Sequence, residues 1–254
     1  LLLCDKIGTE RGMILAILLN NLVADDCATL EQIEQKFDND CTKIIKGLNK
    51  ARKLSAKQAA VESENFKKLL LTFAEDIRVI IIMIVERLCI MRAINHHPNE
   101  NYRYEIACEA SYLFAPLAHR LGLYNIKSEL EDLSLKYTNR EVYSQIAHKL
   151  SETKRDRDKY IAEFIAPIEE KLHKCGLKFQ IKGRTKSIYS IWNKMKKQKI
   201  DIDRIYDLFA IRIIIDTPIE KEIDDCWLAY SQITDDPNYK PIPERMKDWL
   251  TVPK

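Results

Sequence analysis

Positively charged side chains are concentrated between Lys174 and Lys199 of this 254-residue chain. The segment contains nine Lys or Arg residues and no acidic residue, whereas the whole chain has a formal net charge of only +3. A lysine-rich helix face is often simply solvated, but charge concentrated on one short segment is better explained by a phosphate-rich ligand than by solubility. The segment therefore predicts a phosphate-binding site.

A strand, a turn at Gly183 and a basic helix that begins at Ser187 are expected to form this site. Glycine would allow the sharp turn and a close backbone approach, and the unpaired N–H groups at a helix start attract anions. Arg184 could bind phosphate oxygens with both arms of its guanidinium or lie flat on a base, whereas Lys186 would act as a point charge. Lys194 lies about two helical turns beyond Ser187 and could reach the same side.

Asp207 and Arg212 are the polar residues expected around the second, apolar strand. Asp207 stands just before the strand, where a carboxylate can hold a divalent cation against phosphates. Arg212 lies within the run AIRIII, and because burying an unpaired guanidinium is costly, we expect it to bind a ligand or an acid. Their odd spacing places them on opposite faces of a regular strand, so they share a site only if the strand begins after Asp207 or bends there.

Two motifs in this segment closely resemble the synthetase domain of the long RelA/SpoT-type (p)ppGpp synthetase/hydrolases. They read GRTKSIYSIW at 183–192 and IYDLFAIR at 205–212, in the order and at the separation found in that family. The resemblance implies transfer of pyrophosphate from ATP to the 3′-hydroxyl of GDP or GTP, with release of AMP. It makes Asp207 the catalytic carboxylate that binds Mg²⁺. It also assigns ATP binding to five residues, of which the two arginines would enclose the adenine: Arg184, Lys186, Ser190, Lys194 and Arg212.

The resemblance continues into the C-terminal tail. Residues 245–248 read RMKD, the basic form of a family motif that faces the guanine nucleotide, and Lys247 and Lys254 fall on phosphate-contacting positions. In the family, an Asn-Gly-Tyr acceptor segment and a Glu that shares the magnesium with Asp207 follow, and this sequence stops before both. We therefore expect a GTP/GDP diphosphokinase as the full-length protein and weak or no activity in this fragment. The family's C-terminal region, which contacts the ribosome and deacylated tRNA, also lies beyond it.

The first half resembles the HD-type hydrolase of the same family, which removes the 3′-pyrophosphate of (p)ppGpp with a manganese ion. In this chain the His-Asp pair has become two amides, the catalytic Glu has become Ala, and a later Asn has become Ile. Only two of the corresponding residues remain acidic, and neutral amides are poor ligands for a transition metal. Mn²⁺ binding and hydrolysis are therefore not expected from these degenerate positions: Asn20, Asn21, Ala24, Asp25, Glu86 and Ile90.

Helical periodicity dominates the first 150 residues, with Met13 to Leu22 as one apolar run and Thr29 with Gln32 as a capping box. A charged helix from Ser151, ended by Gly176, then precedes a strand, the basic helix, a second strand and another helix. This pattern predicts a mostly α, α+β fold. We assign residues 1–118 to an all-helical HD-type domain, 119–150 to connecting helices, and 151–254 to an incomplete, nucleotidyltransferase-like α/β synthetase domain.

Several protein classes are disfavoured by composition. No apolar run approaches 18 residues without a charge, which argues against a membrane span, and the first residues do not read as a secretory signal. Seven dispersed cysteines without a CxxC pair favour free thiols in a reducing cytoplasm. The six glycines form neither a GxGxxG motif nor a Walker loop.

Three other functions stay open on the sequence. The chain could be a non-catalytic regulatory module that binds guanine nucleotides, or a hydrolase with an atypical metal site that recruits His96 and His97. These adjacent histidines before a proline are more typical of an exposed loop. The basic helix could also bind RNA, but its Tyr189 and Trp192, three residues apart, are expected in the core, whereas an RNA-binding surface would need exposed aromatic side chains.

Overall fold

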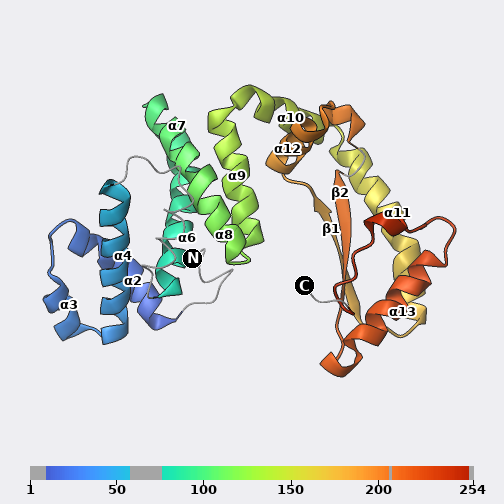
Figure 1. Cartoon of the computed structure of the whole chain (residues 1–254), viewed down its shortest axis with the longest axis horizontal. Helices are drawn as coiled ribbons and strands as arrows, with labels where there is room; N and C mark the ends of the chain where they lie inside the picture. The colour runs from blue at the N-terminus through green and yellow to red at the C-terminus, as the bar shows by residue number, and fades with distance from the viewer. Residues whose placement is uncertain (1–9, 58–75, 206–207, 252–254) are drawn as a thin grey trace. The chain divides into compact units, whose positions relative to one another are not determined.

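The computed structural model describes residues 10–57, 76–205 and 208–251 (Figure 1). The chain divides into two compact units, residues 1–144 and residues 145–254. The division lies within the predicted connecting helices, 119–150. Helices make up most of the described chain, and one two-stranded sheet lies in the second unit. The predicted mostly α, α+β fold is therefore confirmed.

The described part of the first unit consists of helices joined by short loops. Local signals in the sequence set where some of them begin: Thr29 Oγ1 accepts a hydrogen bond from the N–H of Gln32, and the Gln32 side chain accepts one from the N–H of Thr29. This is the predicted capping box, and it starts α3. The elements of this unit are α2 (Arg11–Ala24), α3 (Leu30–Lys36), α4 (Asn39–Lys57), α6 (Ile77–Ala93), the 3-10 turn η1 (Ile94–His96), α7 (Glu100–Glu109), the π-helical turn η2 (Ala110–Phe114), α8 (Ala115–Arg120) and α9 (Tyr124–Thr138).

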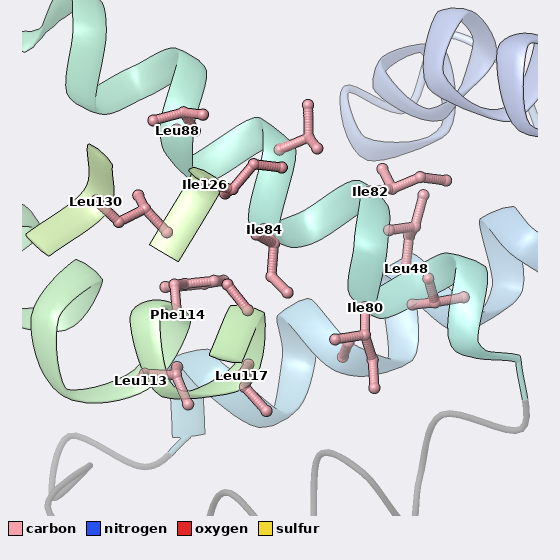
Figure 2. Close-up of a cluster of buried hydrophobic side chains, with 14 of the residues drawn as sticks. Leu48, Ile80, Ile82, Ile84, Leu88, Leu113, Phe114, Leu117, Ile126 and Leu130 are labelled. Atoms are coloured by element: carbon pink, nitrogen blue, oxygen red, sulfur yellow. The ribbon is translucent and has the colours of Figure 1, made fainter. Parts of the chain in front are cut away.

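Helix α6 is the centre of the hydrophobic core in this unit. It packs against α4, α8 and α9, and its Ile84 and Leu88 are fully buried. Figure 2 shows side chains of α6 gathered with those of η2, α8 and α9, among them Phe114 and Leu130. The apolar run around Val79–Val85 is thus part of a globular core. Among the described helices, none is both long enough and apolar enough to cross a membrane.

Arg78, in the first turn of α6, joins three parts of this unit through ion pairs. Its guanidinium contacts Asp76, which caps α6, Asp40 at the start of α4, and Glu10 before α2, at 2.6 to 2.8 Å. Hydrogen bonds from Arg78 hold the pKa of Asp40 and of Asp76 below the usual range of a carboxyl group. The starts of α4 and α6 are therefore fixed to each other by charge as well as by packing.

The second unit places two helices on one face of an antiparallel sheet. Strands β1 (Phe179–Thr185) and β2 (Phe209–Ile215) pair along their whole length, and α11 (Lys154–Lys174) and α13 (Glu222–Thr234) pack on one face through Ile168, Leu172 and Ala229. The basic helix α12 (Ile188–Gln198) connects the strands. The unit also holds α10 (Arg140–Glu152), whose first residues lie in unit one, and three 3-10 turns: η3 (Ile202–Arg204), η4 (Ile219–Lys221) and η5 (Pro243–Arg245).

Two glycines, one before β1 and one within it, have different roles. Gly176 has a φ of +72°, its N–H bonds to the carbonyl of His173, and the next N–H bonds to Leu172, so it ends α11 as predicted. The predicted turn at Gly183 is wrong, because Gly183 lies inside β1 opposite Ile211. A Cβ at Gly183 would lie 3.3 Å from Cγ2 of Ile161 on α11. The glycine therefore gives the helix room to approach the strand.

Candidate functional site

The sheet of the second unit has a polar face opposite the one covered by α11 and α13. Burial alternates along β2, so Ala210, Arg212 and Ile214 are exposed, and along β1 Lys182 is exposed as well. The antiparallel register pairs Lys182 with Arg212 and position 184 with Ala210, and residues directly opposite each other share a face. Positions 182, 184 and 212 therefore lie on one face, which we call the open face.

The open face corrects one expectation and adds a residue. Arg212 is exposed, so the argument that its guanidinium would be buried in an apolar strand was wrong. Arg212 is a candidate ligand-binding residue because of its neighbour on the paired strand: Lys182 stands directly opposite it. Like charges in that arrangement repel each other, and a bound anion would remove the repulsion. Lys182 was missed from the sequence because only the strand register reveals its partner.

The start of α12 lies at the end of β1, as predicted. Ser187 caps the helix: its Oγ accepts a hydrogen bond from the N–H of Ser190 at 3.3 Å and donates one to Oγ of Ser190 at 2.8 Å. The N–H of Lys186 donates to the carbonyl of Leu208 at 2.8 Å, which ties the helix entrance to the start of β2. The helix start, with its N–H groups and positive dipole end, therefore adjoins the edge of the open face.

The strand β2 begins at Phe209, which meets the condition for Asp207 and Arg212 to share a site. Asp207 itself lies outside the described residues, and so do Tyr206 and Lys254. The backbone of Arg184 belongs to β1, and its position is known from the register alone. The Mg²⁺ site at Asp207 therefore stays a prediction.

The aromatic residues of α12 are less buried than predicted. Ile191 is fully buried, whereas Tyr189 and Trp192 are half-buried and meet edge to face with ring centroids 5.7 Å apart. The ammonium group of Lys196 lies 3.3 Å from the centroid of the Trp192 ring. Lys194 is half-buried and lies one helical turn beyond Ser190, so it shares that side of the helix.

The tail residue Lys247 is exposed in an irregular segment after η5. The segment is held to α13 by a contact of 3.5 Å between the hydroxyl of Tyr230 and Sδ of Met246. Within the described part of the unit, no hydrogen bond or ion pair joins Lys247 to the sheet or to α12. Its role in binding GDP or GTP therefore stays a prediction.

The degenerate hydrolase positions lie around an arginine that the sequence did not single out. Arg52 on α4 donates from Nη2 to Oε1 of Glu86 on α6 at 2.8 Å. With its amide oxygen turned toward Arg52, the buried Asn20 on α2 accepts from Nη1 at 3.0 Å and from Nη2 at 2.9 Å. One guanidinium thus links three helices. No pattern along the chain predicts this network, because the three residues are far apart in the sequence.

A cavity of about 340 Å³ adjoins this network and is lined by Arg52, Glu86 and Ile90, among others. The residues present do not fit a transition metal, because a guanidinium already neutralises Glu86 and Asn20 offers only a neutral oxygen. Asn21, Ala24 and Asp25 are exposed. Within residues 10–57, 76–205 and 208–251, no three His, Cys, Asp or Glu side chains come together as a metal site would require.

His96 and His97 do not lie in that cavity's lining. Both are exposed, and Nδ1 of His97 accepts a hydrogen bond from the N–H of Asn99 at 3.3 Å. Asn99 in turn caps α7. The expected exposure of both histidines is therefore confirmed, but only His97 lies in the loop before α7, because His96 belongs to the 3-10 turn η1.

Replacing Arg52 with Ala should lower the free energy of unfolding by about 1–3 kcal/mol, because it leaves the buried Asn20 amide unsatisfied. The measurement is urea denaturation, with Lys46→Ala as control. Lys46 forms an exposed ion pair with Glu34 at 3.4 Å, so its loss should cost at most about 1 kcal/mol. Mn²⁺ should leave the wild-type midpoint unchanged, since only a ligand that binds the folded state raises it. Stabilisation of the wild type by Mn²⁺ would contradict our assignment.

Comparison with known proteins places both halves of the chain. Residues 2–124 match the HD domain, and residues 183–254 match the region found in RelA/SpoT proteins. The chain is 36% identical over 253 residues to a GTP pyrophosphokinase of Myxococcus xanthus. This match covers 98% of the chain and 32% of that protein. The chain is also 32% identical over 250 residues to a guanosine-3′,5′-bis(diphosphate) 3′-pyrophosphohydrolase of Aquifex aeolicus. This match covers 98% of the chain and 34% of that protein.

A relative named for synthesis and a relative named for hydrolysis thus each match 98% of the chain, and the chain spans about a third of their length. The HD domain corresponds to the helical first unit, in which Arg52 joins two of the degenerate positions. The RelA/SpoT region begins at Gly183, within β1, and includes α12 and positions 184 and 212 of the open face, whereas Lys182 lies one residue before it. The chain therefore belongs to the RelA/SpoT family of (p)ppGpp synthetase/hydrolases.

Proposed function

We propose that this protein is an alarmone synthetase of the stringent response, transferring pyrophosphate from ATP to the 3′-hydroxyl of GDP or GTP to yield (p)ppGpp and AMP. The observation that carries the proposal is the open face, where Lys182 and Arg212 stand opposite each other beside the start of α12. Paired cations next to a helix start suit a polyphosphate, because backbone N–H groups and full charges act on the same ligand. The relative from Myxococcus xanthus, named a GTP pyrophosphokinase, supports this direction of the reaction.

In this proposal the residues of the second unit bind and orient the two nucleotides. Arg212, with Arg184, holds the adenine and the adjacent phosphates of ATP, and Lys182 adds charge from the opposite strand. Lys186, Ser190 and Lys194 hold the remaining phosphates from α12 and its entrance. Lys247 and Lys254 bind the phosphates of GDP or GTP. Such transfer depends mainly on positioning and on neutralising charge, which are the two effects that these residues can supply.

Asp207 would hold Mg²⁺, which neutralises charge on the transferred group when it is bound. The first unit contributes no hydrolysis in this proposal, since the guanidinium of Arg52 balances the negative charge of Glu86 in place of a metal ion. A cytoplasmic location, and regulation by the ribosome and deacylated tRNA through a C-terminal region, belong to the same proposal. They rest on the family resemblance.

Arg212→Ala should raise the Kd for ATP with Mg²⁺ about tenfold or more, because each charge-assisted hydrogen bond to phosphate contributes on the order of 1.5–3 kcal/mol. Calorimetry on the 254-residue chain measures this, and Lys182→Ala should act in the same direction. Arg155→Ala is the matched control, because Arg155 is an exposed cation on α11, outside the open face. ATP affinity that is equal in all four proteins would refute the assignment of the open face.

Transfer itself is tested by AMP release from ATP and GDP in the natural full-length protein. AMP release that Arg212→Ala reduces would support the synthetase. Tight guanine-nucleotide binding without AMP release would favour a regulatory module.

A further inference from the structure

A second cavity of the first unit lies away from the degenerate hydrolase positions. It has a volume of about 490 Å³, and its walls come from η1, the start of α7, the end of α9 and the first residue of α10. It shares no lining residue with the cavity beside Arg52. The volume lies within the range of about 300–1,000 Å³ that is typical of small-molecule sites. The side chains that matter here are Glu100, Arg103, Tyr104, Lys136, Tyr137 and Arg140.

Positive charge is in excess in this cavity. Arg103, Lys136 and Arg140 line it, and Glu100 is the single carboxylate among its lining residues. Glu100 is already occupied, because its Oε1 lies 2.9 Å from Nη2 of Arg103. In the described part of the chain, neither Lys136 nor Arg140 forms an ion pair. Two cations therefore face the same space without an acid to balance them, which favours an anionic ligand.

The orientation of Arg103 is fixed before any ligand binds. Its Nη1 donates to the backbone carbonyl of His97 at 2.7 Å, and its Nη2 donates to Glu100. The side chain is about one-fifth exposed, whereas that of Glu100 is almost fully exposed. An arginine held in this way loses little conformational entropy when an anion binds, so the cavity is preorganised at one end.

Aromatic rings supply the apolar part of the cavity. Tyr104 is half-exposed, and the Lys136 ammonium lies 5.6 Å from the centroid of the Tyr137 ring. Like any tyrosine hydroxyl, that of Tyr137 is protonated at neutral pH and can donate a hydrogen bond, and burial raises its pKa further. An aromatic ring can stack on a base, and the cations beside it can bind phosphates. The cavity therefore suits a ligand that has both a base and phosphates.

We propose that this cavity binds a nucleoside polyphosphate, with the phosphates on Lys136, Arg140 and Arg103 and the base against Tyr104 or Tyr137. The site is separate from the open face of the second unit, and the inference does not depend on the proposed synthetase activity. It gives the helical unit a ligand-binding function that requires no metal and no hydrolysis.

The test is hydrogen–deuterium exchange of the 254-residue chain with GDP, with ATP and with inorganic pyrophosphate. This readout separates the two sites, because protection at residues 95–140 reports this cavity and protection at 179–215 reports the open face. We expect a nucleotide to slow exchange at residues 95–140, and to do so at a concentration at least tenfold lower than pyrophosphate requires. Protection that pyrophosphate produces equally well, or no protection in this region, would overturn the proposal.

The variant Lys136→Gln/Arg140→Gln should raise the nucleotide concentration needed for that protection about tenfold or more, since it removes both unbalanced cations. Lys36→Gln/Lys159→Gln is the matched control, because it removes two exposed cations that lie outside the cavity. Thermal melts of both proteins verify that they fold. Arg212→Ala should leave protection at residues 95–140 intact even if it abolishes protection at 179–215. Equal nucleotide responses in the cavity variant and its control would refute the site.

Discussion

Asp207→Asn in the natural full-length protein should reduce the kcat for (p)ppGpp synthesis by about 10²–10³-fold or more, the usual cost of removing one group that stabilises transition-state charge. An amide keeps the size of the side chain but not the charge that would hold Mg²⁺ against the transferred pyrophosphate. We expect the loss mainly in kcat, because Arg212 and the residues of α12 would still bind ATP. The measurement is AMP and (p)ppGpp formation from ATP and GDP at saturating Mg²⁺.

Asp216→Asn is the matched control for this substitution. Asp216 is an exposed acid just after β2, at the other end of the strand from Asp207, and its backbone N–H bonds to the carbonyl of Lys178. Its side chain has no role in the proposed site, so synthesis should continue at close to the wild-type rate. An Asp207→Asn protein that still makes (p)ppGpp at the control rate would show that the catalytic carboxylate lies elsewhere.

Leu88→Ala should destabilise the first unit by about 2–5 kcal/mol, the cost of truncating a fully buried leucine in a core that cannot collapse around it. Leu88 has no exposed surface, and α6 packs against α4, α8 and α9. The measurement is urea denaturation followed by a probe of the first unit, because the two units need not unfold together. Nucleotide binding at the open face should change little.

Leu18→Ala provides the comparison for Leu88→Ala. Leu18 lies on α2 and is 67% exposed, so its truncation should change stability by no more than about 0.5 kcal/mol. If both substitutions cost the same, α6 would not be the centre of the core that we describe.

The sequence alone determined the features that depend on neighbours along the chain. The capping box at Thr29, the cap at Ser187 and the end of α11 at Gly176 were all predicted, because each is a hydrogen-bonding pattern within a few residues. Strand and helix periodicity gave the mostly α, α+β fold for the same reason. The order of two motifs was enough to indicate the family, since it too is read along one chain.

Only the tertiary structure decided which distant residues meet. The Arg52 network joins α2, α4 and α6, and the opposition of Lys182 and Arg212 follows from a strand register. Gly183 was misread as a turn because a glycine that makes room for Ile161 looks the same in sequence as one that bends the chain. Caps and periodicity are local, whereas register and helix packing are set by burial over the whole unit, so the side chains that share a site could be known only from the fold.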